Sequence, residues 1–176
     1  MDAIANPVTS SIKAQVRPSE LLSLLDQLDN QIKVLSLDCF DTIIWRKTTS
    51  AIDAFYDMHQ KPHFKALNLS ANLRASIEVD ARRNMLFQHG KTEVALKDIY
   101  KAGFPFLSED QIKALMKEEI ETEHEVCYAF PPLIELIRAA HHRGLKIVIV
   151  SDTYFTEKQL RHLLEKKITR RCHESN

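Results

Sequence analysis

Two short clusters of polar side chains contain the residue types that phosphate chemistry uses. Asp38 and Asp41 follow one apolar run, and Ser151 with Asp152 follows another. A carboxylate at the tip of a buried strand is costly to desolvate unless a metal ion or backbone N–H groups use it. Asp38 and Asp41 are therefore candidates for holding one cation, and the Ser151 hydroxyl is a candidate donor to a phosphate oxygen.

The same residue types have an ordinary structural explanation. Asp and Ser after a strand are frequent helix caps and turn formers, so neither cluster alone indicates a site. Their joint appearance after two apolar strands favours the chemical interpretation. The carboxyl ends of parallel strands are where α/β proteins collect their chemistry.

The elements that must position these residues can be read from the apolar periodicity. It predicts buried strands at 33–38 and 146–151 and a helix over about 19–30, with a short extended segment at 43–45. Ser50, Ser70, Ser108 and Thr156 are expected helix N-caps. Ser70 begins a long helix with an expected inward face of Leu73, Ile77, Asp80/Ala81 and Met85, ending at Gly90; the other helices are expected at 51–59, 92–101, 108–124, 133–142 and 157–167.

This pattern predicts an α/β fold whose parallel sheet is interrupted by a long helical insertion. The expected division is a mobile N-terminus at 1–18, a core from 19–45 and 131–170, a helical insertion at 46–130 and a tail at 171–176. Two parallel strands make a poor sheet by themselves. We therefore expect an exposed strand edge that is open to self-association.

The composition of the chain argues against several classes of protein. The 176 residues carry 24 basic and 24 acidic side chains, which disfavours a nucleic-acid binder that acts through bulk charge. The chain has three glycines, and their positions match neither of the glycine-rich phosphate-binding motifs. No apolar run is long enough to span a membrane, and no secretory signal is visible. Cys39, Cys127 and Cys172 are expected to be free thiols in a cytoplasmic protein.

The two clusters and the insertion together resemble the haloacid dehalogenase (HAD) superfamily. The segment 34–43 resembles its first motif, an apolar strand followed by a nucleophilic Asp and, four residues on, a Thr. The segment 146–151 resembles its second motif. The resemblance is closest to a bacterial branch of predicted hydrolases with S-F-D-x-F-D-T and S-D-x-Y motifs and R-x-x-x-E-x-x-A-R spacing, here Arg74, Glu78, Ala81 and Arg82.

The resemblance implies a partial HAD-like Rossmannoid core with a mostly helical cap. It also implies Mg²⁺-dependent hydrolysis of a small phosphorylated substrate through an aspartyl intermediate. Asp38 would be the nucleophile and the metal ligand. Thr42, Ser151 and Asp152 would contact the substrate or steady its loop.

Two departures keep alternatives open. The family's usual general acid lies two residues after the nucleophile, where this chain has Phe40, so Asp41 is the candidate acid and carbon–halogen hydrolysis is a second possibility. The printed sequence also lacks the family's later Lys and acidic motif. A truncated, catalytically inactive remnant or a binding module is therefore the alternative function.

Two groups of charged residues outside the motifs have simpler expectations. The acidic residues Glu119 and Glu123 with His124 are expected on a solvated helix face. Arg74 and Arg82 are expected to pair with Glu78 four residues away, with an Arg directed toward a substrate anion as the alternative. Phe40 and Trp45 are expected to pack.

Overall fold

The computed structural model describes residues 15–170 and divides them into two compact units. The first contains residues 15–35 and 131–147, and the second contains 36–130 and 148–170. The predicted mobile segment lies outside the described residues for positions 1–14. The tail at 171–176, with Cys172, lies outside them as well.

The first unit is two helical segments that pack together. In chain order its helices are η1 (Pro18–Glu20), α1 (Leu21–Leu24), η2 (Leu25–Gln27) and α7 (Pro131–His142). The single helix expected over 19–30 is therefore wrong in form, because it is split into three short pieces that stop at Gln27. The Asp29 carboxylate accepts the Gln31 N–H at 2.8 Å, a local turn that competes with helix continuation. Gly144 follows α7 with φ 82°, as expected of a helix-ending glycine.

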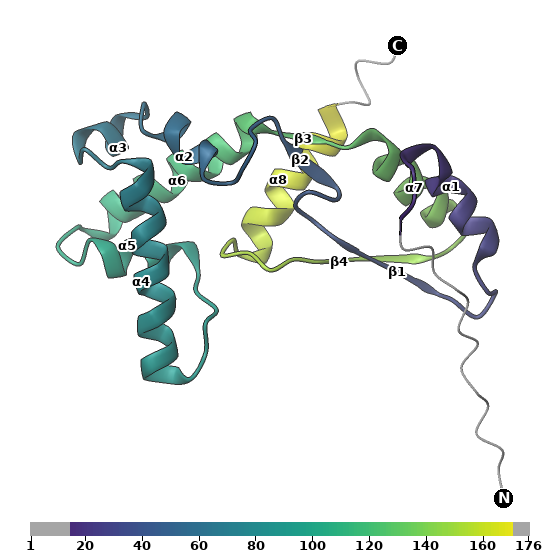
Figure 1. Ribbon diagram of the computed structural model, residues 1–176, viewed down its shortest axis with the longest axis horizontal. Coiled ribbons are helices and arrows are strands. Elements are labelled where there is room, and N and C mark those ends of the chain that lie inside the picture. Colours follow the sequence, from purple (N-terminus) through teal and green to yellow (C-terminus); the bar gives the residue numbers. More distant parts are fainter. Residues whose placement is uncertain (1–14, 171–176) are drawn as a thin grey trace, which may run out of the picture. The chain divides into compact units, whose positions relative to one another are not determined.

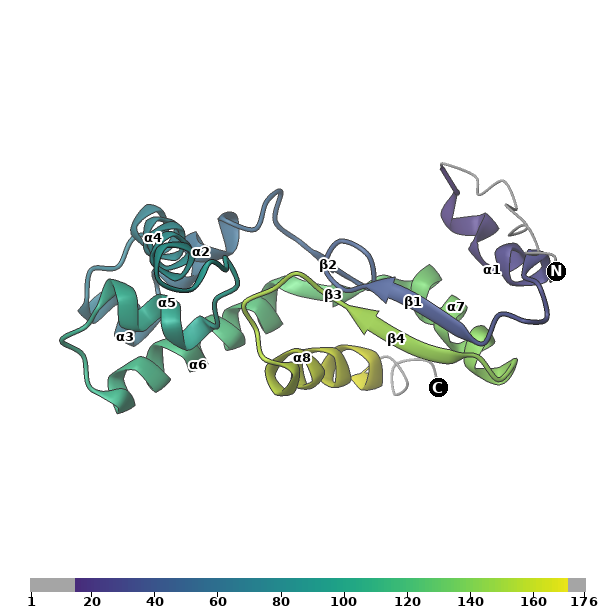
Figure 2. The same ribbon diagram turned by 90° about the horizontal axis from the view of Figure 1, so that it is seen from below.

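Strands β1 (Val34–Asp38) and β4 (Lys146–Val150) form a two-stranded parallel sheet, and their arrows run the same way in Figure 2. This confirms a mixed α/β protein and both predicted strands within one residue. The expectation that the strands are buried is wrong, since Val34 is 48% exposed and Val150 62%. Within the described chain each strand keeps one edge without a strand neighbour.

The second unit is mainly helical (Figure 1). Its helices are α2 (Asp53–Met58), α3 (Pro62–Ala66), α4 (Ala71–His89), α5 (Leu96–Gly103), α6 (Glu109–Val126) and α8 (Glu157–Arg170). Strands β2 (Ile44–Arg46) and β3 (Cys127–Ala129) pair antiparallel, with Trp45 opposite Tyr128. The extended segment at 43–45 is thus confirmed, whereas its partner β3 was not expected.

Local capping chemistry explains where these helices begin and end. The Ser70 hydroxyl accepts the Leu73 N–H, Gly90 closes α4 with φ 68°, and Ser108 forms a reciprocal capping box with Gln111. Thr156 and Gln159 make the corresponding exchange before α8. The cap expected at Ser50 is wrong, because α2 begins only at Asp53 and the Asp53 carboxylate accepts the Ser50 N–H.

The apolar core of the second unit lies between α2, α3, α4, α5 and α6. Phe64, Leu96, Ile99 and Tyr100 are fully buried there. Ile77 and Ala81 point inward from α4 as expected, but Leu73 is 41% exposed. Arg74 occupies the inward position instead.

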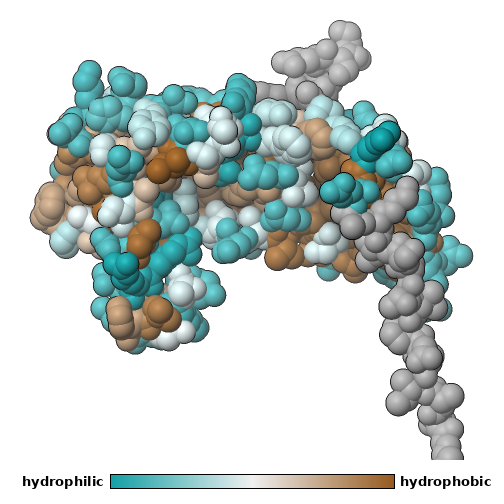
Figure 3. All heavy atoms as spheres, in the orientation of Figure 1, coloured by the Kyte–Doolittle hydropathy of each residue, from teal (hydrophilic) through white to brown (hydrophobic). Residues whose placement is uncertain are grey.

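Polar and apolar side chains alternate over the face seen in Figure 3, with brown side chains gathered where α4 ends. Leu86 and the largely exposed Phe87 belong to that end of the helix. Among residues 15–170, no helix is both long and apolar enough to cross a membrane.

Candidate functional site

The first cluster forms a tight turn directly after β1. Cys39 is buried, and its carbonyl accepts the N–H groups of Ile43 and Ile44 at 2.8 and 3.0 Å. This turn brings the Thr42 hydroxyl back to donate to Asp38 Oδ2 at 3.3 Å. The Asp38 carboxylate is exposed at the strand tip, where an incoming group can reach it.

Asp41 adopts a left-handed backbone conformation, with φ 55°, in the middle of this turn. Its N–H donates to the Ile44 carbonyl at 2.8 Å. Its carboxylate is 78% exposed and lies 3.8 Å from the Arg46 guanidinium. The described contacts of Asp41 are therefore with Arg46 and the turn.

Arg46 links the first cluster to the helical part of the unit. Its guanidinium lies 4.5 Å from the centre of the Phe40 ring and donates from Nε to Glu123 Oε2 at 3.3 Å. Burial opposes the charge of Arg46, but the Glu123 carboxylate outweighs it and raises the pKa of Arg46. Burial also raises the pKa of Glu123, against the opposing pull of Arg46.

The second cluster continues from β4 into a loop that is tied to the helices. Ser151 is half-buried and Asp152 is exposed. The Thr153 hydroxyl accepts the Phe155 N–H at 3.3 Å, and the Tyr154 carbonyl accepts the Leu96 N–H of α5 at 2.9 Å. The loop is thus held by its own side chains and by the start of α5.

A cavity of about 420 Å³ within the second unit lies between the helices, Asp152 of the second cluster, and Phe40 and Arg46, which neighbour the first cluster in the chain. Aromatic rings contribute to its wall, and two arginines and two acids contribute its charge. It is lined by Phe40, Arg46, Ala51, Ile52, Phe55, Ala75, Glu78, Arg82, Asp152, Thr153, Tyr154 and Phe155. Its volume falls in the range of small-molecule sites.

Of the residues expected at a site, the structure places Asp152 in this cavity. It places Asp38 and Thr42 in a hydrogen bond with each other at the end of β1. Asp38, Asp41, Thr42 and Ser151 are not among the residues that line the cavity. Because β1 and β4 are neighbours in a parallel sheet, Asp38 and Ser151 both lie at its carboxyl edge.

A buried charged network lies behind the cavity, and it corrects the expectation of a solvated acidic face. Glu119 is 1% exposed and Glu123 is 2% exposed. Arg74 donates from Nε and Nη2 to the two Glu119 oxygens at 2.8 and 2.7 Å, and the Tyr100 hydroxyl donates to Glu119 Oε2. Each acidic residue is inside because a cation far away in the chain meets it there, Arg74 for Glu119 and Arg46 for Glu123.

The network reaches both the cavity wall and the second cluster. Arg74 also donates to Glu78 at 3.1 Å, and Glu78 accepts from Arg82 at 2.9 Å, so the expected i, i+4 pairs are present. The Arg74 guanidinium lies 5.0 Å from the Tyr154 ring centre. Burial, followed by the Glu119 charge, raises the pKa of Tyr154 well above its usual value.

Arg46, Tyr100 and Tyr154 acquire roles in this arrangement that the residue patterns did not predict. The available signal was the spacing of Arg74, Glu78 and Arg82 opposite the acidic run of α6, since a buried arginine needs a carboxylate partner. Phe40 packs as expected, 6.2 Å from Phe155, while Trp45 stacks on Phe130 but stays 39% exposed.

The end of β1 offers one carboxylate, that of Asp38, as an oxygen ligand for a hard cation. The exposed Asp38 carboxylate offers oxygen, and Mg²⁺ is often held by one or two carboxylates with water and substrate phosphate. Among residues 15–170 no group of three or more His, Cys, Asp or Glu side chains is arranged to hold a metal ion. The described residues fit a cation held mainly by Asp38, and they form no enclosed protein cage.

No protein-family model matches the sequence, and no curated protein matches it.

Proposed function

We propose that this chain is a Mg²⁺-dependent, HAD-like phosphate-ester hydrolase that acts through an aspartyl intermediate on Asp38. The observation that supports it most is the Asp38–Thr42 hydrogen bond at the carboxyl edge of β1, beside the strand that ends at Ser151. The adjacent cavity, with Asp152, Thr153 and Arg82 in its wall, supplies room for the organic part of a small substrate.

In this proposal the Asp38 carboxylate attacks phosphorus, the bond from phosphorus to the ester oxygen breaks, and the leaving alcohol takes a proton from water or an acid. Water then attacks phosphorus, the bond between phosphorus and the Asp38 oxygen breaks, and inorganic phosphate leaves with Asp38 returned to its free form. Thr42 holds Oδ2, which leaves the other carboxylate oxygen to react. Ser151 donates a hydrogen bond to the transferring group.

Asp38 is the residue that would hold Mg²⁺. The ion, when bound, offsets the repulsion between the carboxylate and the phosphate. Asp41 is the proposed acid, and its exposed carboxylate lies 3.8 Å from the Arg46 guanidinium.

Hydrolysis of para-nitrophenyl phosphate with and without Mg²⁺ tests the proposal. Turnover by the full chain is expected to fall at least about 100-fold in Asp38→Asn, because the nucleophile is lost. Asp57→Asn, an exposed carboxylate on α2, is the matched control and is expected to keep full activity.

Radioactive phosphate trapped on the wild-type chain by acid quenching, and absent from Asp38→Asn, distinguishes covalent from water-only hydrolysis. Equal rates in the wild type and Asp38→Asn would remove Asp38 from the reaction. Binding of the phosphate ester without turnover would favour the alternative of a binding module.

A further inference from the structure

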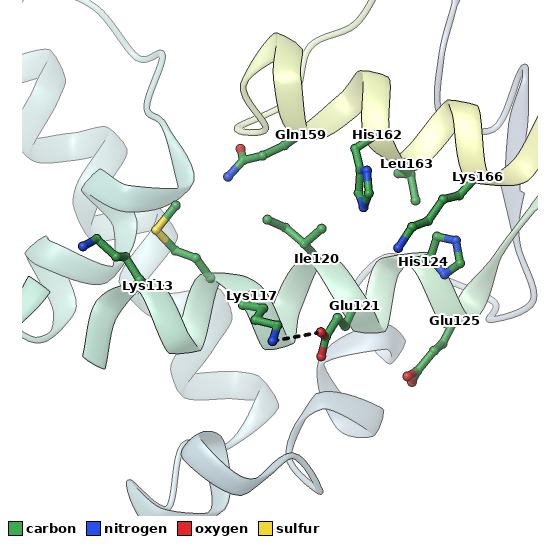
Figure 4. A pocket seen from close by; sticks show the side chains of 11 residues that line it. Lys113, Lys117, Ile120, Glu121, His124, Glu125, Gln159, His162, Leu163 and Lys166 are labelled. Carbon is green, nitrogen blue, oxygen red and sulfur yellow. Dashed lines mark ion pairs between the residues drawn. The ribbon is translucent and has the colours of Figure 1, made fainter. Parts of the chain in front are cut away.

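A second cavity lies within the helical unit, between α6 and α8 (Figure 4). It has a volume of about 460 Å³, again in the range of small-molecule sites. None of the residues that line it lines the cavity beside the two clusters. The two cavities are therefore separate sites.

The floor of this cavity is apolar. Met116 and Ile120, one helical turn apart on α6, face Leu163 of α8. Leu163 is 3% exposed, whereas Met116 and Ile120 are half-buried and stay accessible. A flexible thioether beside branched side chains adapts its shape to an apolar ligand.

The rim of the cavity is polar and mostly basic. In Figure 4, Gln159 and His162 extend from α8 toward α6, and the Lys166 amine reaches over the floor toward His124. Lys113 and Lys117 line the α6 side. A ligand on the apolar floor would thus meet several donors at its edge.

The acidic groups of the rim already have partners. Lys117 lies 3.8 Å from Glu121, and Lys61 lies 2.8 Å from Glu125. Lys113 is paired with Asp110 at 3.0 Å. Within residues 15–170 no ion pair joins Lys166 to a carboxylate, so its charge is available to a ligand.

We propose that this groove binds a single-chain amphipathic anion, with its apolar part on Met116, Ile120 and Leu163 and its head group at Lys166 and His162. An acyl or alkyl chain with a carboxylate or phosphate head has this chemistry. The groove volume of about 460 Å³ suits one chain of such a molecule, and the basic end excludes a cationic head.

Titration of the full chain with decanoate below its micelle concentration, followed by calorimetry, tests the proposal. Decanoate and decyl phosphate are expected to bind, and neutral decanol and decyltrimethylammonium are expected to bind at least about fivefold more weakly. Lys166→Gln is expected to weaken decanoate binding about fivefold, the loss that corresponds to one exposed charge contact.

Lys158→Gln is the matched control, because Lys158 is exposed on the same helix but does not line the groove. It is expected to bind decanoate as the wild type does, and so is Asp38→Asn. Ile120→Gln is expected to weaken binding of both decanoate and decanol, which separates the floor from the rim. Circular dichroism verifies that each variant is folded.

Equal affinity for decanoate and decyltrimethylammonium would overturn the proposal. So would unchanged decanoate binding in both Lys166→Gln and Ile120→Gln. Sedimentation with phosphatidylglycerol vesicles, without binding of monomeric decanoate, would instead indicate a membrane surface and would also overturn it.

Discussion

At the residue scale, the buried ion pair of Arg74 and Glu119 is the charged contact whose loss should destabilise the fold most. Both side chains are almost completely buried, at 0% and 1% exposure, and they meet through two hydrogen bonds. Breaking a buried pair leaves an uncompensated charge, which typically costs about 3–5 kcal/mol, although the intact pair need contribute little. Arg74 also lies over the rings of Phe55 and Tyr154, so its position affects the loop after β4.

Arg74→Met is therefore expected to lower the free energy of unfolding by about 3–5 kcal/mol. Glu119→Leu is expected to have a similar effect, and the double variant is expected to cost less than the sum of the two. Urea denaturation followed by fluorescence measures all three. Arg83→Met, at an exposed ion pair on the same helix, should leave the midpoint unchanged. Additive single effects would contradict the coupling.

At the element scale, the contact between α4 and α5 depends on a glycine. A Cβ added at Gly103, the last residue of α5, would lie 2.7 Å from Cγ2 and 2.9 Å from Cβ of Ile77. Helix propensity alone favours alanine over glycine by up to about 1 kcal/mol. Overpacking of a tight contact typically costs about 1–3 kcal/mol and so outweighs that gain.

Gly103→Ala is accordingly expected to destabilise the protein by about 1–2 kcal/mol, measured by thermal or urea unfolding. In an Ile77→Ala background, where Cγ2 and Cδ1 are gone and only the 2.9 Å contact with Cβ of residue 77 remains, the same change should cost less than in the wild type. Ala102→Ser, on the exposed side of the helix, is the control and should have little effect. A more stable Gly103→Ala protein would show that the two helices separate without cost.

At the scale of the whole molecule, several thiol and phenol groups that are buried in their neutral form make the folded state less stable at alkaline pH. Burial, and then the charge of Asp38, raises the pKa of Cys39 from 9.0 to about 12. Burial likewise raises the pKa of Cys127, Tyr100 and Tyr154. As pH rises above about 9, the unfolded chain releases these protons before the folded chain does, so the folded state loses relative stability.

The free energy of unfolding is therefore expected to be lower at pH 10 than at pH 8, with the fall continuing toward pH 12. Urea unfolding at fixed ionic strength measures it. A Cys39→Ala/Cys127→Ala variant is expected to show a shallower fall, because two of the four groups are removed. A wild-type stability that stays level between pH 8 and pH 10 would contradict the burial of these groups.

The sequence by itself determined the features that depend on neighbouring residues. Both strands were located within one residue of their bounds, and the caps at Ser70, Ser108 and Gly90 were correct. Local hydrogen bonds and backbone preferences act over three or four positions, so a short window of sequence contains the information. The same holds for Asp38 and Thr42, which lie four residues apart and form a hydrogen bond.

Only the tertiary structure decided which faces are buried. The acidic residues Glu119 and Glu123 of α6 have the spacing of a solvated stripe. Their burial depends on partners far away in the chain, Arg74 for Glu119 and Arg46 for Glu123. The helical pattern gave no sign that Leu73 would face outward while Arg74 faced inward, or that residues 127–129 would pair with 44–46. A charged side chain enters a core only when a partner from another element meets it, and that meeting is a property of the packed molecule.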